Sequence, residues 1–87
     1  MKSTEYFILK KLEDGYKLNL LNSWNKETIP TIIEEIKSLK FHPNKKMYID
    51  FQDLKELDSI AIIYLISFFK KFRIKNISYL NLEKDIK

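Results

Sequence analysis

The sequence has no cysteine and only one histidine, one glycine and two prolines among its 87 residues. Without cysteine there is no disulfide framework, no thiolate zinc site and no cysteine nucleophile. A single histidine, His42, argues against a histidine-built metal site and against a Ser-His-Asp triad. These absences exclude many classes of enzyme active site. The 45% hydrophobic content indicates a folded domain rather than a disordered chain.

Long hydrophobic runs are also absent. The longest, residues 60–66, is far shorter than the roughly 20 residues of a membrane-spanning helix. Residues 1–5 include an acid, and they do not resemble the start of a signal peptide. We therefore expect a soluble, intracellular protein whose length predicts a single domain over residues 1–87.

The net charge of +4 does not favour a nucleic-acid partner. Arg73 is the only arginine among the 16 basic residues, whereas base recognition relies heavily on arginine, and acids are interspersed throughout. The densest basic run, residues 70–75, falls where a helix is expected to end, and cations are favoured there by the helix dipole. Anionic lipid headgroups are the alternative interpretation of this run.

Hydrophobic periodicity predicts the order β-β-α-β-α-β, which is typical of an α/β domain. Asp14 and Gly15 separate apolar runs at residues 5–12 and 16–21, and such a pair predicts a hairpin because it tolerates positive φ. Apolar residues at helical spacing predict a helix over residues 29–39, with Asn25 or Thr28 as its cap. The next predicted element is a strand at 47–51. A helix that begins at Asp58 or Ser59 and runs to residue 72 comes after it, and a strand at 77–82 is the last. Because no helix follows the last strand, an excised fragment or a minimal domain is expected.

The second helix has apolar residues on both of its faces. One face should pack on the sheet and comprises Ile62, Leu65, Ile66, Phe69 and Phe72. The opposite face carries Ser67 and Lys71 but also the apolar Ile60, Ile63 and Tyr64. An apolar cluster facing outward indicates a partner, although cover by residues outside this chain and ordinary exposure remain alternatives.

Residues 47–62, with the sequence MYIDFQDLKELDSIAI, resemble the signature of STAS domains. Asp50 matches the aspartate at the end of the family's strand, Leu54 and Leu57 match the loop anchors, and Asp58 and Ser59 match the helix opening. The resemblance covers nearly the whole chain in its order of elements. It implies a STAS-like mixed β-sheet with helices packed mainly on one face.

Within that family the sequence looks most like the N-terminal STAS domain of Mla-type lipid-transport ABC permeases, through residues 21–24 and the opening of the second helix. The resemblance implies a non-catalytic regulatory domain at the cytoplasmic face of the inner membrane, either an excised N-terminal fragment of a longer permease or a free-standing subunit. Its partners would be the ATPase subunit and the permease transmembrane region. Docking would use Ser59, Ile60, Ile63, Tyr64 and Ser67.

The alternative within the family is a free-standing antagonist of an anti-sigma factor, which is switched by phosphorylation. The hydroxyl residue that is phosphorylated in that branch corresponds to Ile60 here, which has no hydroxyl. Ser59 could still carry a phosphate, although a capping role would engage its hydroxyl. Ala61 replaces the usual glycine, which puts a very close backbone approach in doubt.

Four acids, Asp50, Asp53, Glu56 and Asp58, lie at the junction of the third strand and the second helix. Their oxygens would suit Mg²⁺ or Ca²⁺, but their spacing matches no calcium loop, and no glycine-rich phosphate loop is present. We expect instead that Asp50, Asp58 and Ser59 cap the helix and order the loop, with no metal, cofactor or catalytic residue. The remaining candidates, Trp24 and Tyr48, are expected in the core, and His42 in a loop.

Overall fold

The fold is a five-stranded sheet with two helices on one of its faces, in a computed structural model that describes residues 2–42, 44–74 and 76–81. The sheet has the order β1-β2-β3-β5-β7, with β1 at Lys2–Ser3, β2 at Phe7–Lys11, β3 at Gly15–Leu20, β5 at Lys46–Asp50 and β7 at Ile77–Leu80. The strands β1, β2 and β3 are antiparallel, whereas β5 pairs parallel with both β3 and β7. The predicted α/β class with a mixed sheet is therefore confirmed.

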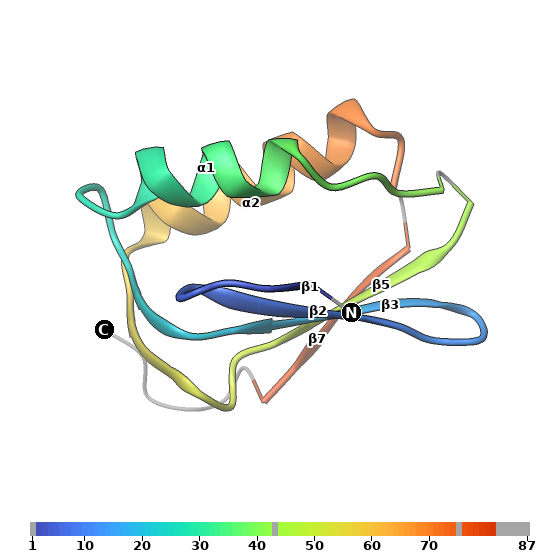
Figure 1. Ribbon diagram of the computed structural model, residues 1–87, viewed down its shortest axis with the longest axis horizontal. Helices are drawn as coiled ribbons and strands as arrows, with labels where there is room; N and C mark the ends of the chain where they lie inside the picture. The colour runs from blue at the N-terminus through green and yellow to red at the C-terminus, as the bar shows by residue number, and fades with distance from the viewer. Residues whose placement is uncertain (1, 43, 75, 82–87) are drawn as a thin grey trace.

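The helices α1 (Ile29–Lys37) and α2 (Ser59–Lys71) lie side by side above the sheet (Figure 1). Each makes a crossover between parallel strands, from β3 to β5 and from β5 to β7. A second, two-stranded sheet pairs β4 (Asn22–Trp24) with β6 (Leu54–Leu57). This small sheet joins the two segments that lead into the helices, and it was not expected.

Most of the predicted elements are present, with bounds that differ from the predicted ones by one or two residues. The structure ends α1 at Lys37 and β7 at Leu80, and the expected end of that last strand, Leu82, lies outside the described residues. β1 was not expected. Thr28 is the N-cap residue of α1 but makes no side-chain cap bond. Asn25 instead accepts hydrogen bonds from the amides of Glu27 and Thr28, so it orders the turn before the helix.

The hairpin prediction was right, but its physical reason was wrong. Gly15 does not have a positive φ. A Cβ atom on Gly15 would lie 2.0 Å from the carbonyl oxygen of Lys46, which is on the adjacent strand. Glycine is needed there because β3 and β5 approach closely.

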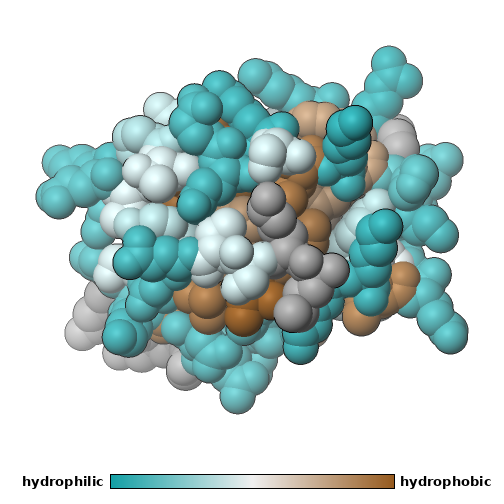
Figure 2. Space-filling model, viewed as in Figure 1, coloured by the Kyte–Doolittle hydropathy of each residue, from teal (hydrophilic) through white to brown (hydrophobic). Residues whose placement is uncertain are grey.

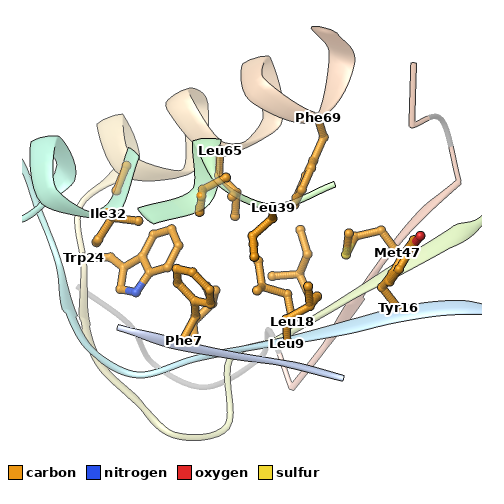
Figure 3. Close-up of a cluster of buried hydrophobic side chains, with 14 of the residues drawn as sticks. Phe7, Leu9, Tyr16, Leu18, Trp24, Ile32, Leu39, Met47, Leu65 and Phe69 are labelled. Atoms are coloured by element: carbon orange, nitrogen blue, oxygen red, sulfur yellow. The ribbon is translucent and has the colours of Figure 1, made fainter. Parts of the chain in front are cut away.

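The core lies between the sheet and the helices (Figure 3). Alternate residues of each strand point toward the helices, so Tyr16, Leu18 and Leu20 of β3 are buried. Trp24 is fully buried, as expected, and its indole N–H donates to the carbonyl of Tyr6 at 3.0 Å.

Tyr48 was expected in the core, and that expectation was wrong. No helix among the described residues covers the other face of the sheet, where Tyr48 lies beside Lys17 and is only partly buried. Its hydroxyl donates to Asp14 at 3.2 Å.

Candidate functional site

Helix α2 begins at a well-defined point next to Trp24. Asp58 has extended backbone angles, and its carboxylate accepts a hydrogen bond from the amide of Ile60 at 3.1 Å. The backbone amide of Asp58 donates to the carbonyl of Trp24 at 2.8 Å. Asp58 is therefore the cap residue, and its position ties the helix start to the small sheet.

Ser59 does not cap the helix, because Asp58 occupies that position. Ser59 is the first residue of α2, and its side chain is exposed. Within residues 2–42, 44–74 and 76–81, its hydroxyl has no hydrogen-bond partner. The expected engagement of this hydroxyl in capping was thus wrong.

The buried face of α2 is formed by Ala61, Leu65 and Phe69, and Figure 3 shows Leu65 and Phe69 directed toward the sheet. Leu65 and Phe69 were predicted to pack there. Ile62 and Ile66 are only partly buried because they flank this stripe. Ala61 was not predicted to belong to this face, since a single methyl group contributes little to a hydrophobic pattern.

Phe72 was predicted to pack on the sheet but is 36% exposed. It lies at the C-cap of α2, beyond the last full turn over the sheet. Its ring packs instead against the rings of Phe68, 4.8 Å away between centroids, and Phe41, 6.3 Å away. The aromatic side chains at this end of the helix therefore pack mainly on each other.

The outward face of the first half of α2 is apolar. Ile63 is 62% exposed, Tyr64 48% and Ile60 39%, and these three lie at i, i+3 and i+4 on adjacent turns. The structure brings them together with two exposed serines. We call this surface the α2 face, and it comprises Ser59, Ile60, Ile63, Tyr64 and Ser67.

Tyr64 lies at the edge of the α2 face that is nearest to α1. It lines an apolar crevice between the helices with Ile33 and Phe68. The crevice has a volume of about 10 Å³, which is room for one water molecule at most. The crevice is therefore too small to be a binding site for a small-molecule ligand.

Asp50 is a buried acidic residue at the end of β5, and it is only 3% exposed. Its Oδ1 accepts hydrogen bonds from the amide of Gln52 at 3.0 Å and from the Asn81 side chain at 2.7 Å. Its Oδ2 lies 3.4 Å from Nζ of Lys17. Asp50 thus orders the loop after β5 and connects β3 to the end of β7.

Two opposing influences set the pKa of Asp50. Burial is the largest and would raise the pKa, but the hydrogen bonds from Asn81 and Gln52 and the nearby Lys17 ammonium outweigh it. The pKa is consequently below the usual value for an aspartate. The ionised form is the one that the fold stabilises.

The four acids near this junction have different partners. Asp53 accepts a hydrogen bond from Asn19, Glu56 accepts one from Asn25, and Asp58 caps α2. Among the described residues, no three histidine, cysteine, aspartate or glutamate side chains lie close enough together to hold a metal ion. The partners Lys17, Asn19 and Asn81 were not recognised from the sequence, because they come from distant segments and carry no local motif.

No described helix is long and apolar enough to cross a membrane. No family model matches the sequence, and no curated protein matches it significantly. A comparison with solved structures found a chain described as "Crystal Structure Analysis of Mglu", with a TM-score of 0.67 at 8% identity. The match covers 92% of this chain and 20% of that chain, so the present chain spans about a fifth of its length. At this identity the likeness shows the fold alone, a small α/β domain with a mixed sheet and two helices.

Proposed function

We propose that this chain is a STAS-like protein-interaction domain that docks on the ATPase subunit of an Mla-type lipid-transport ABC transporter. It acts by binding rather than by chemistry, beside the permease at the cytoplasmic face of the inner membrane. The observation that carries the proposal is the exposure of Ile63 at the centre of the α2 face. The class of partner is supplied by the resemblance of residues 21–24 and of the opening of α2 to the STAS domain of Mla-type permeases.

The α2 face has the properties of the centre of a protein interface. It combines two β-branched aliphatic side chains with a tyrosine, and small hydroxyl residues flank them. Tyrosine is enriched at such centres because it offers a large apolar area together with a polar group. The cap at Asp58 and the packing of Leu65 hold the helix in place, so little conformational freedom of the backbone would be lost on binding.

The test is affinity capture from a detergent extract of the source cell, with the wild type, Ile63→Asp and Leu12→Asp side by side. Leu12 is a matched control because it is 40% exposed and lies in the hairpin turn, which is not part of the α2 face. We expect the wild type and Leu12→Asp to recover an ABC ATPase and Ile63→Asp to lose it. Recovery of no ATPase by the wild type, or equal loss with both variants, would contradict the proposal.

The exposed hydroxyl of Ser59 favours a second candidate, a phosphorylation-controlled antagonist of an anti-sigma factor. A phosphate at the first residue of a helix is stabilised by the helix dipole. Incubation with ATP and an extract of the source cell, followed by mass spectrometry, tests this candidate. Phosphate on Ser59 and recovery of a sigma-system regulator would favour it, and an unmodified Ser59 would count against it.

A further inference from the structure

One end of the molecule, opposite the start of α2, brings together three segments (Figure 1). They are the hairpin turn between β2 and β3, residues 40–42 and 44–46, which lead into β5, and the C-terminus of α2. The ring of Phe41 lies 5.2 Å from that of Tyr16 and 6.3 Å from that of Phe72, between centroids. The amide of Lys46 donates to the carbonyl of Asp14 at 3.1 Å.

These segments expose many basic side chains and few acidic ones. The acids here are Glu13 and Asp14, and Asp14 already accepts a hydrogen bond from Tyr48. Within the described ranges, none of the basic side chains at this end makes an ion pair. We call this surface the basic end, and it comprises Lys11, Lys40, Lys45, Lys46, Lys70, Lys71 and Arg73.

Apolar groups lie among these charges. Leu12 is 40% exposed and Phe72 36% exposed. A cavity of about 350 Å³ is lined by Lys70 and Arg73 together with Ile74 and Ile77. Figure 2 shows hydrophilic side chains along the right-hand edge with smaller hydrophobic areas between them. Basic and apolar groups are therefore combined on the same surface.

Arg73 has a backbone conformation that favours glycine. Its φ is 60°, and its amide donates to the carbonyl of Lys70 while that of Ile74 donates to Phe69, which completes a Schellman motif. A side chain other than glycine is strained at this position. The only arginine of the chain occupies this helix-ending position, where glycine is the usual residue.

We propose that the basic end binds the surface of an anionic lipid bilayer. The lysines and Arg73 contact headgroup phosphates, and Leu12 and Phe72 enter the boundary between headgroups and acyl chains. Charge complementarity carries the proposal, because cations that make no ion pair within the described residues are attracted to a negatively charged membrane surface. The exposed Leu12 and Phe72 favour a bilayer over a nucleic acid, and the scarcity of arginine agrees.

This surface is distinct from the α2 face, so the inference does not rest on the proposed function. The apolar centre of the α2 face and the basic end lie toward opposite ends of α2, since the rise of a helix separates Ile60 from Arg73 by about 20 Å, whereas Ser67 at the margin of the α2 face is one turn from Lys71. A domain could therefore bind a membrane with one end and a protein with the other.

The test is co-sedimentation of the chain with vesicles of equal parts phosphatidylcholine and phosphatidylglycerol, compared with vesicles of phosphatidylcholine alone. We expect binding only to the anionic vesicles. It should weaken when salt is raised from about 0.1 M to about 1 M, because the screening length falls from about 10 Å to about 3 Å.

Lys70→Gln/Arg73→Gly should weaken binding to the anionic vesicles roughly 25-fold, at about fivefold for each charge removed. Its melting temperature should not fall, since glycine relieves the strained backbone at residue 73. The matched control, Lys26→Gln/Lys55→Gln, removes the same charge from exposed sites near the start of the helices. It should retain most of the binding.

Three results would overturn the proposal. The first is a failure of the wild type to bind anionic vesicles at low salt. The second is an equal loss of vesicle binding in the two double variants, which would show that the net charge of the chain, not the basic end, determines the binding. The third is tighter binding to a single-stranded RNA oligonucleotide than to the vesicles at the same salt concentration.

Discussion

At the scale of single residues, two buried positions determine how the strands of this sheet meet. Gly15 permits β3 to approach β5, and Asp50 connects β3 to the end of β7. Neither role is evident from the local sequence. Asp14-Gly15 indicated a turn but not a close approach, and the partners of Asp50 lie 33 residues before it at Lys17 and 31 after it at Asn81.

Gly15→Ala should destabilise the domain by about 1–3 kcal/mol, as overpacking generally does. The added methyl would lie 2.0 Å from the Lys46 carbonyl oxygen, so β3 and β5 must separate. Urea unfolding followed by circular dichroism gives the change. Glu13→Ala, at an exposed position in the same turn, should stay within about 0.5 kcal/mol of the wild type. Equal effects would show that the turn, not the strand contact, is responsible.

Asp50→Asn should destabilise the domain by about 1–2 kcal/mol at neutral pH, because hydrogen bonds to a charged acceptor weaken and Lys17 loses its partner. The pKa of Asp50 is lower in the folded chain than in the unfolded chain, where it is about 3.9. Its stabilisation is therefore complete above that pH and is lost as the pH falls through the folded pKa.

Unfolding midpoints in urea between about pH 7 and about pH 2.5 measure this dependence. The difference between the wild type and Asp50→Asn should narrow as the solution becomes more acidic. Asp53→Asn is the control, since Asp53 is exposed. A difference between wild type and Asp50→Asn that stays constant down to the lowest pH would show that the charge of Asp50 does not contribute.

At the scale of elements, the two helices, the hairpin and the central strand could be predicted, because each has a strong periodic pattern. β1 and β4 could not, since strands of two or three residues are too short for alternation to show, and the sequence LKEL of β6 does not alternate between apolar and polar residues. The outward cluster of Ile60, Ile63 and Tyr64 was found from helical spacing alone. The predicted position of the buried face of α2 was partly wrong, because the observed buried face includes the weakly hydrophobic Ala61.

The two faces of α2 should respond differently to the same substitution. Phe69→Asp should abolish folding, because Phe69 is fully buried and an unpaired buried charge is destabilising by several kcal/mol. Ile63→Asp should change the stability by no more than about 0.5 kcal/mol. Ile62→Asp should fall between them, since Ile62 is partly buried. Thermal unfolding by circular dichroism ranks the three, and an unfolded Ile63→Asp would contradict the assignment of the faces.

At the scale of the whole molecule, charge and hydrophobic surface are unevenly distributed along α2. Acidic side chains such as Glu56 and Asp58 lie near the start of this helix beside the apolar α2 face, whereas Lys70, Lys71 and Arg73 lie at its end. The sequence showed the basic run, and the helix dipole accounts for part of it. It did not show that Lys11, Lys45 and Lys46 join the run in space, because that depends on how the turns meet.

The two proposals together predict that this domain recruits its protein partner to a membrane. With the purified chain, the captured ATPase and anionic vesicles, the ATPase should sediment with the vesicles only when the domain is present. Ile63→Asp should leave the domain on the vesicles but release the ATPase, because Ile63 belongs only to the α2 face. Lys70→Gln/Arg73→Gly should leave both proteins together in the supernatant, because only the membrane contact is weakened. If instead the ATPase displaced the domain from the vesicles, the two surfaces would overlap, and the separation of about 20 Å along α2 would be too short for simultaneous binding.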